Sequence, residues 1–207
     1  MADFWQNVSL EPKRAFKFVL TIAGGSGGGK IPQFLIKKVS KPSFTVSESE
    51  HKFLNHSFWF PGKVSWGEVS FTIVDVLGNE DGAAHLMDLL VQSGYSYPGT
   101  INADDTSTLR TMSKAKSTGA LGKVQIKQID SGGGTTGKEE PTIRETWVLE
   151  NAWIKDVKFG ELDYDSEDML NVEVALKYDN AVLQTSNDKG EYRAVIPGTS
   201  EVFSKTD

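Results

Sequence analysis

The chain has 207 residues, a formal net charge of −6 and no cysteine. This length fits one domain, or one domain with extensions, and the lack of cysteine excludes disulfides and thiolate metal sites. The acidic balance argues against tight wrapping of DNA. No apolar run approaches the roughly 18 residues that a membrane span needs. Residues 1–10 also lack the basic flank and apolar stretch of a signal peptide.

The N-terminal part predicts a strand over residues 15–23. Its apolar face is formed by Phe16, Phe18, Leu20 and Ile22. Two aromatic side chains, Phe4 and Trp5, precede this strand. They either tuck under the domain or form an N-terminal contact with another subunit.

Two glycine-rich segments imitate the first part of a phosphate-binding loop. Residues 24–30 end in Lys30, but Ile31 stands where a Ser or Thr should hold magnesium, and an extended stretch follows instead of a helix. The second segment, 132–138, is followed by Glu139 and fails in the same way. Both segments are better interpreted as flexible loops.

Residues 34–76 predict a strand, a long exposed hairpin and a second strand. Pro42 closes the first strand, because proline has no N–H for a sheet ladder, and Pro61 with Gly62 predicts a turn. The second strand alternates in a way typical of one buried and one wet face. Its apolar side consists of Val69, Phe71 and Ile73, and its polar side of Glu68, Ser70 and Thr72.

The hairpin, about residues 42–63, poses a physical problem because large apolar side chains crowd both of its faces. The arm residues of interest are Phe44, Val46, Phe53, Leu54, Phe58, Trp59 and Phe60. A two-stranded arm alone in water is marginally stable, and its side chains and open edges need a partner surface. Either the arm folds back on its own core or it docks on a neighbouring copy.

The rest of the chain predicts one helix and further strands. The helix covers residues 83–91, with Asp81 as its cap and Gly94 at its end. Residues 95–120 predict a long polar loop with at most a short element. Strands are expected over residues 121–130, 143–155 and 170–178. Residues 192–196 have a strand-like pattern, but the glycine, proline and polar residues around them favour a loose extension.

Several of these stretches resemble one protein family. The run 58–66, FWFPGKVSW, is similar to the hairpin exit of phage tail tube proteins of contractile-tailed, T4-like bacteriophages. Residues 12–22, 39–44 and 147–178 are similar to further parts of the same family. The resemblance covers about two-thirds of the chain and rests on pattern instead of a diagnostic motif. It departs at residues 24–30, at residues 131–140 and after residue 180.

The resemblance implies a mainly β fold, with a small β-barrel or sandwich, one flanking α-helix and a long protruding hairpin arm. The domain would span residues 1–180, and residues 181–207 would form a C-terminal extension. Family members assemble into hexameric rings, which stack into the inner tail tube. Glu68, Ser70 and Thr72 are then lumen-facing candidates, and the arm is the inter-subunit contact.

The partners implied by the resemblance are other copies of the chain, the tail sheath protein, the tape measure protein and the baseplate or tube initiator. DNA would pass through the lumen without specific binding, because an acidic or neutral wall does not attract phosphates. The chain would lie in the virion tail, and in the host cytoplasm during assembly, with no membrane anchor. Alternatives are the tube of a type VI secretion or extracellular contractile injection system, a baseplate tube initiator, and a monomeric β-sandwich binding module.

No catalytic or metal constellation emerges from the sequence. The acidic run that begins at Asp163 imitates a calcium loop, but Asp168 replaces the glycine that the sharp turn needs. His51 and His56 lie five residues apart on an extended segment, so they face opposite sides. We therefore expect a non-enzyme that has no cofactor and no bound metal.

Overall fold

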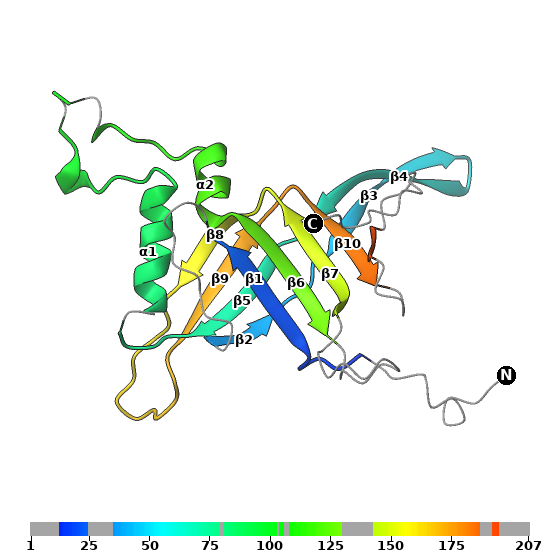
Figure 1. The fold of residues 1–207 in the computed structure, drawn as a ribbon. Helices are drawn as coiled ribbons and strands as arrows, with labels where there is room; N and C mark the ends of the chain where they lie inside the picture. The colour runs from blue at the N-terminus through cyan, green and yellow to red at the C-terminus, as the bar shows by residue number, and fades with distance from the viewer. Residues whose placement is uncertain are drawn as a thin grey trace, which may run out of the picture.

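The structure is a computed structural model, and it places most of the chain. The described residues are 13–24, 35–78, 81–102, 104–105, 108–129, 143–186 and 192–194. The fold is mainly β, as the sequence predicts, with antiparallel strands arranged in three sheets and two α-helices among the described residues (Figure 1). Phe4, Trp5 and most of both glycine-rich segments lie outside the described residues. Within the described part, no helix is both long and apolar enough to cross a membrane.

The first sheet has five strands in the order β1-β6-β7-β10-β11. Their bounds are Phe18–Ala23 for β1, Lys123–Ile129 for β6, Ile143–Glu150 for β7, Asn180–Ser186 for β10 and Tyr192–Ala194 for β11. The expected alternation is present where the strands cover the core, since Leu20, Val124 and Ile126 are buried. Phe16, which the sequence places on the same apolar face, lies before β1 and is exposed.

The second sheet has four strands in the order β2-β5-β9-β8. Their bounds are Ile36–Val39 for β2, Val69–Val74 for β5, Asn171–Lys177 for β9 and Trp153–Lys158 for β8. Val69, Phe71 and Ile73 are at most 1% exposed, so the predicted buried face of β5 is confirmed. Its neighbour β9 buries Val172 and Val174 in the same layer. The two sheets face each other, and one core cluster takes side chains from both.

Helix α1, Gly82–Gln92, confirms the predicted helix and its cap. The carboxylate of Asp81 accepts a hydrogen bond from the backbone N–H of Ala84 at 2.9 Å, which satisfies a free donor at the helix start. Leu86 and Leu89 join the core. Figure 1 shows α1 standing beside the two sheets, at the end opposite to the arm.

A second helix, α2, corrects the expectation of a single flanking helix. It covers Lys114–Leu121, and the hydroxyl of Ser113 accepts from the backbone N–H of Lys116. A short 3-10 turn, η2, covers Pro98–Thr100. Helix α2 packs near α1 and β8, so the segment predicted as polar loop contributes Ala120 and Leu121 to the core.

The predicted long strand over residues 143–155 is wrong, because the structure divides it between two sheets. Strand β7 ends at Glu150, and β8 begins at Trp153 in the other sheet. Between them, Asn151 adopts φ 54°, a left-handed conformation that asparagine tolerates in turns. The C-terminal extension also needs correction. Strand β10 is hydrogen-bonded to β7, so residues 180–186 belong to the sheet.

Candidate assembly surfaces

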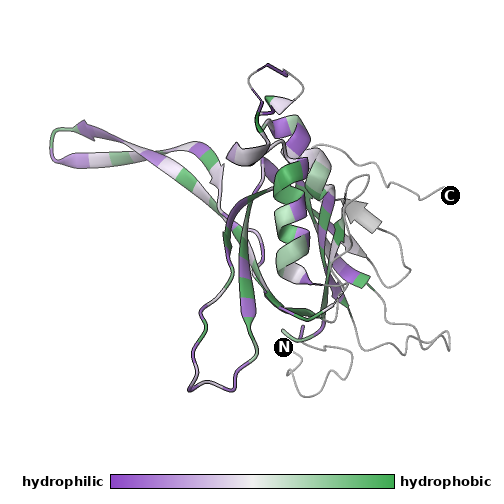
Figure 2. Cartoon of the chain, turned by 90° about the vertical axis from the view of Figure 1, so that its left-hand side faces the viewer, coloured by the Kyte–Doolittle hydropathy of each residue, from purple (hydrophilic) through white to green (hydrophobic). Residues whose placement is uncertain are grey.

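The third sheet is a two-stranded arm that stands away from the domain. Strand β3 covers Phe44–Phe53 and β4 covers His56–Trp66, and both Figure 1 and Figure 2 show the hairpin projecting well beyond the other sheets. Every residue of β3 is exposed, as is every residue of β4 except Trp66. The arm therefore does not fold back on its own core, so the first of the two alternatives for the arm is excluded.

The turn of the arm lies at its far end, at Leu54 and Asn55, and not at Pro61 and Gly62 as predicted. Leu54 has φ 53°, and Phe53 pairs with His56 across the turn. Pro61 and Gly62 lie inside β4, at a shift in the strand register.

The register shift is a β-bulge that Ser47 and Gly62 make possible. The Ser47 hydroxyl accepts a hydrogen bond from the backbone N–H of Lys63 at 2.8 Å. A Cβ atom at Gly62 would collide with that hydroxyl, so the bulge needs glycine there. One extra residue of β4 is accommodated at this point.

The register divides the apolar side chains of the arm between its two faces. Near the root, Phe44 pairs with Trp66 and Val46 with Val64, and Trp59 lies on this same face opposite Glu50. The other face carries the tip aromatics Phe53, Phe58 and Phe60. All the predicted arm residues are exposed, at 62% for Phe44, 43% for Val46, 61% for Phe53, 85% for Leu54, 50% for Phe58, 58% for Trp59 and 57% for Phe60. Figure 2 shows apolar and polar positions interspersed along the arm.

The root of the arm is packed against the domain. The Trp66 ring lies 5.6 Å from the Phe44 ring and 6.1 Å from that of Tyr178, which is buried. Trp66 and Tyr178 both belong to the core assembly. The arm is therefore attached to the domain by aromatic packing, and within the described part of the chain its two strands contact mainly each other.

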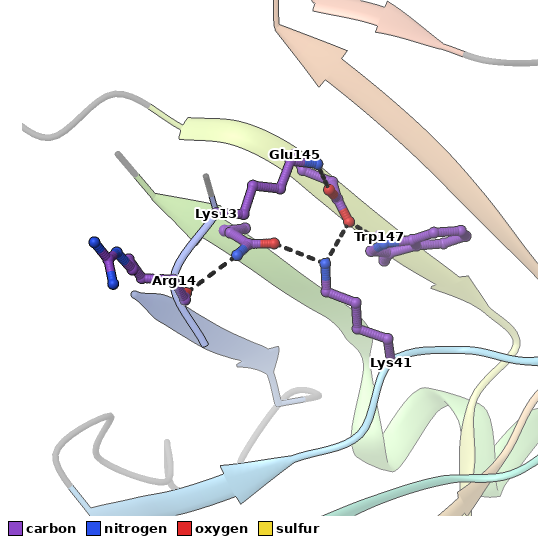
Figure 3. Close-up of polar contacts among 6 residues, drawn as sticks. Lys13, Arg14, Lys41, Glu145 and Trp147 are labelled. Carbon is purple, nitrogen blue, oxygen red and sulfur yellow. Dashed lines mark hydrogen bonds and ion pairs between the residues drawn. The ribbon is translucent and has the colours of Figure 1, made fainter. Parts of the chain in front are cut away.

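A buried carboxylate, Glu145, ties the start of the arm to the five-stranded sheet (Figure 3). It accepts hydrogen bonds from Lys41 Nζ at 2.8 Å, from Trp147 Nε1 at 2.6 Å and from Lys13 Nζ. Lys41 also donates to Gln128 Oε1 at 2.7 Å. Burial raises the pKa of Glu145, but the donors outweigh it and lower the pKa to about 2. The carboxylate therefore stays charged and holds the segment that leads into β3.

The predicted lumen residues lie on the outward face of the four-stranded sheet. Glu68 and Ser70 are exposed and Thr72 is half-buried, on the opposite side of the strand from the core. Glu68 accepts a hydrogen bond from Lys155, which lowers its pKa. The same outward surface carries Lys38, Asp156, Lys158 and Glu173. This face thus carries charges of both signs, and two ion pairs form on it, Lys155 with Glu68 and Lys158 with Glu173.

Among the described residues, the structure shows no cluster that could hold a metal. The acidic run near Asp163 forms the exposed loop between β8 and β9, and no group of three or more ligating side chains converges in the described part of the chain. The prediction that His51 and His56 face opposite sides is wrong, because His56 pairs with Phe53, which shares a face with His51. The two histidines pair with Phe58 and Phe53 and not with each other. Sequence reasoning did not find the Glu145 cluster, whose members are too far apart along the chain to give a local signal.

Neither a family model nor a curated protein matches the chain, but solved structures do. A chain from the sheath/tube terminator of an extracellular contractile injection system superposes with a TM-score of 0.55 and 18% identity, covering 86% of this chain and 100% of that one. The chain has the fold of contractile injection system components. The anti-feeding prophage tube-terminating cap gives a TM-score of 0.56, 14% identity, and coverage of 90% and 100%. The anti-feeding prophage baseplate gives 0.55, 15%, and coverage of 84% and 97%. At the level of the fold, the resemblance noted in the sequence is confirmed.

Proposed function

We propose that the chain is a structural subunit of the inner tail tube of a contractile-tailed bacteriophage, assembled from stacked hexameric rings that conduct DNA. The observation that carries this proposal is the arm. Its apolar side chains are exposed on both faces, and its two strands have no neighbour within the described part of the chain. Such a surface is unfavourable in water and is covered when a second protein docks on it.

Self-association also deals with the open strand edges of the domain. Strands β2 and β8 lie at the two edges of the four-stranded sheet. Exposed edges invite pairing with another chain, and pairing around a ring would close the sheets of several copies into one wall. A barrel with many strands leaves an aqueous channel at its centre. In this arrangement the outward face with Glu68, Ser70 and Thr72 lines the channel.

The charge pattern of that face suits a conduit. Lys155 and Lys158 are paired with Glu68 and Glu173. Lys38 remains on this face without an ion-pair partner in the described part of the chain, so the face would attract a phosphate backbone only weakly. DNA then passes through without specific binding. The outer surface of the tube would meet the tail sheath protein, and the ends of the tube the baseplate or tube initiator, with the tape measure protein inside. The subunit would reach the virion tail after assembly in the host cytoplasm.

A second candidate is the tube of an extracellular contractile injection system or a type VI secretion system, whose cargo is protein. Its injection-system form is favoured by the comparisons, because the structures compared above, all with TM-scores above 0.5, come from extracellular contractile injection and anti-feeding prophage assemblies. Genes for a capsid and terminase beside the gene for this chain would favour the phage tube. Their absence would favour the injection system.

The arm can be tested by the double substitution Trp59→Ser and Phe60→Ser. These side chains lie on opposite faces of the arm, so the variant weakens both faces while the core remains intact. The wild type should form rings or rods in negative-stain images, and the variant should give folded monomers or rings that do not polymerise. The matched control is Leu77→Ser, which removes an apolar side chain that is 101% exposed outside the arm. A wild-type chain that stays monomeric at high concentration would indicate a β-sandwich binding module instead.

A further inference from the structure

The two large sheets leave a groove between their neighbouring edges. Strand β1 is an edge of the five-stranded sheet, and β2 is an edge of the four-stranded one. Between them lies a cavity of about 700 Å³, with an apolar floor and walls. Its apolar lining is formed by Ala15, Phe16, Phe18, Ile36, Val39, Ile126 and Trp147. Phe16 is 75% exposed at its mouth, so the groove is open to solvent and to a docking side chain.

The groove and its rim carry lysines but no acidic residue, in contrast to the acidic chain as a whole. Four of its twelve lining residues are lysines and none of the twelve is acidic. Lys41 is neutralised by Glu145, and Lys37 donates to the amide oxygen of Asn171. Lys38 and Lys127 have no ion-pair partner within the described part of the chain. By the strand register Lys38 lies on the Thr72 side of β2 and Lys127 on the Val19 side of β6, so both belong to the rim of the groove and not to its apolar floor. The groove therefore combines apolar surface with positive charge, and fits a partner that is apolar and negatively charged.

The chain carries a segment of this chemistry in the loop between β8 and β9. The loop contains five carboxylates and no Lys or Arg, namely Glu161, Asp163, Asp165, Glu167 and Asp168. Its apolar side chains stand in water, with Leu162 89%, Tyr164 108% and Met169 71% exposed. The Asp163 carboxylate accepts a hydrogen bond from the backbone N–H of Asp165 at 3.1 Å, which shapes the loop locally.

We propose that this acidic loop of one copy docks into the basic groove of a neighbouring copy. Leu162 and Tyr164 would enter the apolar cavity, and the carboxylates would face the lysines at its rim. The loop does not occupy the groove of its own chain, because its tip is wholly exposed and its C-terminal part lies beside Lys37 in a separate pocket. The arm is a weaker match for the groove, since its two glutamates are balanced by two lysines.

The contact joins two different surfaces, so it is heterologous, and its repetition gives a ring if the rotation closes. Figure 1 and Figure 2 both show the loop between β8 and β9 extending below the domain, whereas the arm leaves it near the top. The loop-to-groove contact is thus separate from the arm contact. The proposal rests on the proposed tube function, which it deepens by naming the surfaces that join two subunits.

The contact can be tested by cross-linking, because the chain has no natural cysteine. Leu162→Cys in one tagged full-length chain and Phe16→Cys in another, mixed with a short bis-maleimide, should give a cross-linked heterodimer. Docking raises the effective concentration of the two thiols from micromolar toward millimolar, so its yield should be at least about tenfold above that of a control pair. The control pair is Leu77→Cys with Phe16→Cys, because Leu77 is equally exposed but lies outside the loop.

Charge reversal identifies the groove as the partner. Lys38→Glu with Lys127→Glu should lower the cross-linking yield about tenfold, since two attractions become repulsions. Lys116→Glu with Lys123→Glu makes the same change in net charge elsewhere and should leave the yield unchanged. Placing Glu161→Lys with Asp165→Lys in the loop-bearing chain should restore cross-linking to the reversed groove.

The outcomes separate this proposal from the tube function. Rods or rings without cross-linking above the control would overturn the loop-to-groove contact and leave the tube function standing. Cross-linking and its charge rescue in a chain that forms no rings or rods would retain the contact and refute the tube. A chain that shows neither would refute both, and a chain that shows both supports both.

Discussion

Replacing Glu145 by Gln tests how firmly the root of the arm is held. The carboxylate is 6% exposed, and Gln keeps its shape while removing the charge that Lys13 and Lys41 share. The fall of its pKa from 4.5 to about 2 corresponds to a ceiling of about 3 kcal/mol. The side chains of the two lysines are 59% and 48% exposed, so solvent screens part of this energy. We expect Glu145→Gln to lower the free energy of unfolding by about 1–2 kcal/mol at pH 7.

The dependence on pH gives the sharper measurement. Because the folded state lowers the pKa of Glu145, the stabilisation is complete above about pH 4.5 and is lost as the pH falls toward 2. Urea unfolding followed by circular dichroism should therefore show wild type and variant converging below pH 4.5. The control is Glu173→Gln, whose side chain is 63% exposed and lies 4.0 Å from Lys158. It should change stability by less than about 0.5 kcal/mol.

Two results would refute this reasoning about Glu145. Equal unfolding free energies for wild type and Glu145→Gln at pH 7 would show that the lysines contribute nothing to its stability. A constant difference between the two proteins from pH 7 to pH 2 would show that the lost energy comes from packing and not from the charge.

Three further predictions concern the backbone and the proposed lumen. Gly122→Ala should destabilise the fold by about 1–3 kcal/mol, because Gly122 has φ 70° and a Cβ there would collide with the carbonyl of Ala23. Gly119→Ala within α2 meets nothing within 4 Å and should stabilise by about 0.5–1 kcal/mol, as thermal unfolding will show. Ser70→Arg with Thr72→Arg should leave tubes intact in electron micrographs but slow DNA ejection, since the added cations hold phosphates. Normal infectivity of that variant would argue against the assignment of this face to the lumen.

Much of the sheet could be predicted because its strands alternate with a period of two. In β5 and β9 every second residue is buried, and the pattern alone identified these residues. The break between β7 and β8 was not predicted because no Gly or Pro stands there, and Asn151 alone forms the turn. Helix α2 was not predicted because it has hardly any apolar stripe: only Ser117, Ala120 and Leu121 are buried.

The assembly surfaces could be predicted only where their residues lie close together in the sequence. The aromatic residues of the arm are close together in the sequence, so the sequence alone predicted the arm and its residues. The Glu145 cluster could not be, because Lys13 and Lys41 lie 132 and 104 residues from it and only the folded sheets bring them together. The basic groove has the same origin, since its lysines come from β2, from the link to the arm and from β6.

The bulge in the arm decides which faces need a partner. A strict alternation along β4 from Phe58 would place Val64 and Trp66 on the same face as Phe58 and Phe60. The extra residue at the bulge moves Val64 and Trp66 to the opposite face, beside Trp59. The root then meets its own domain through Trp66, while the tip presents Phe58 and Phe60 on one side and Trp59 on the other. One flat partner surface cannot cover both sides, so in the proposed tube the arm would lie between two surfaces at once.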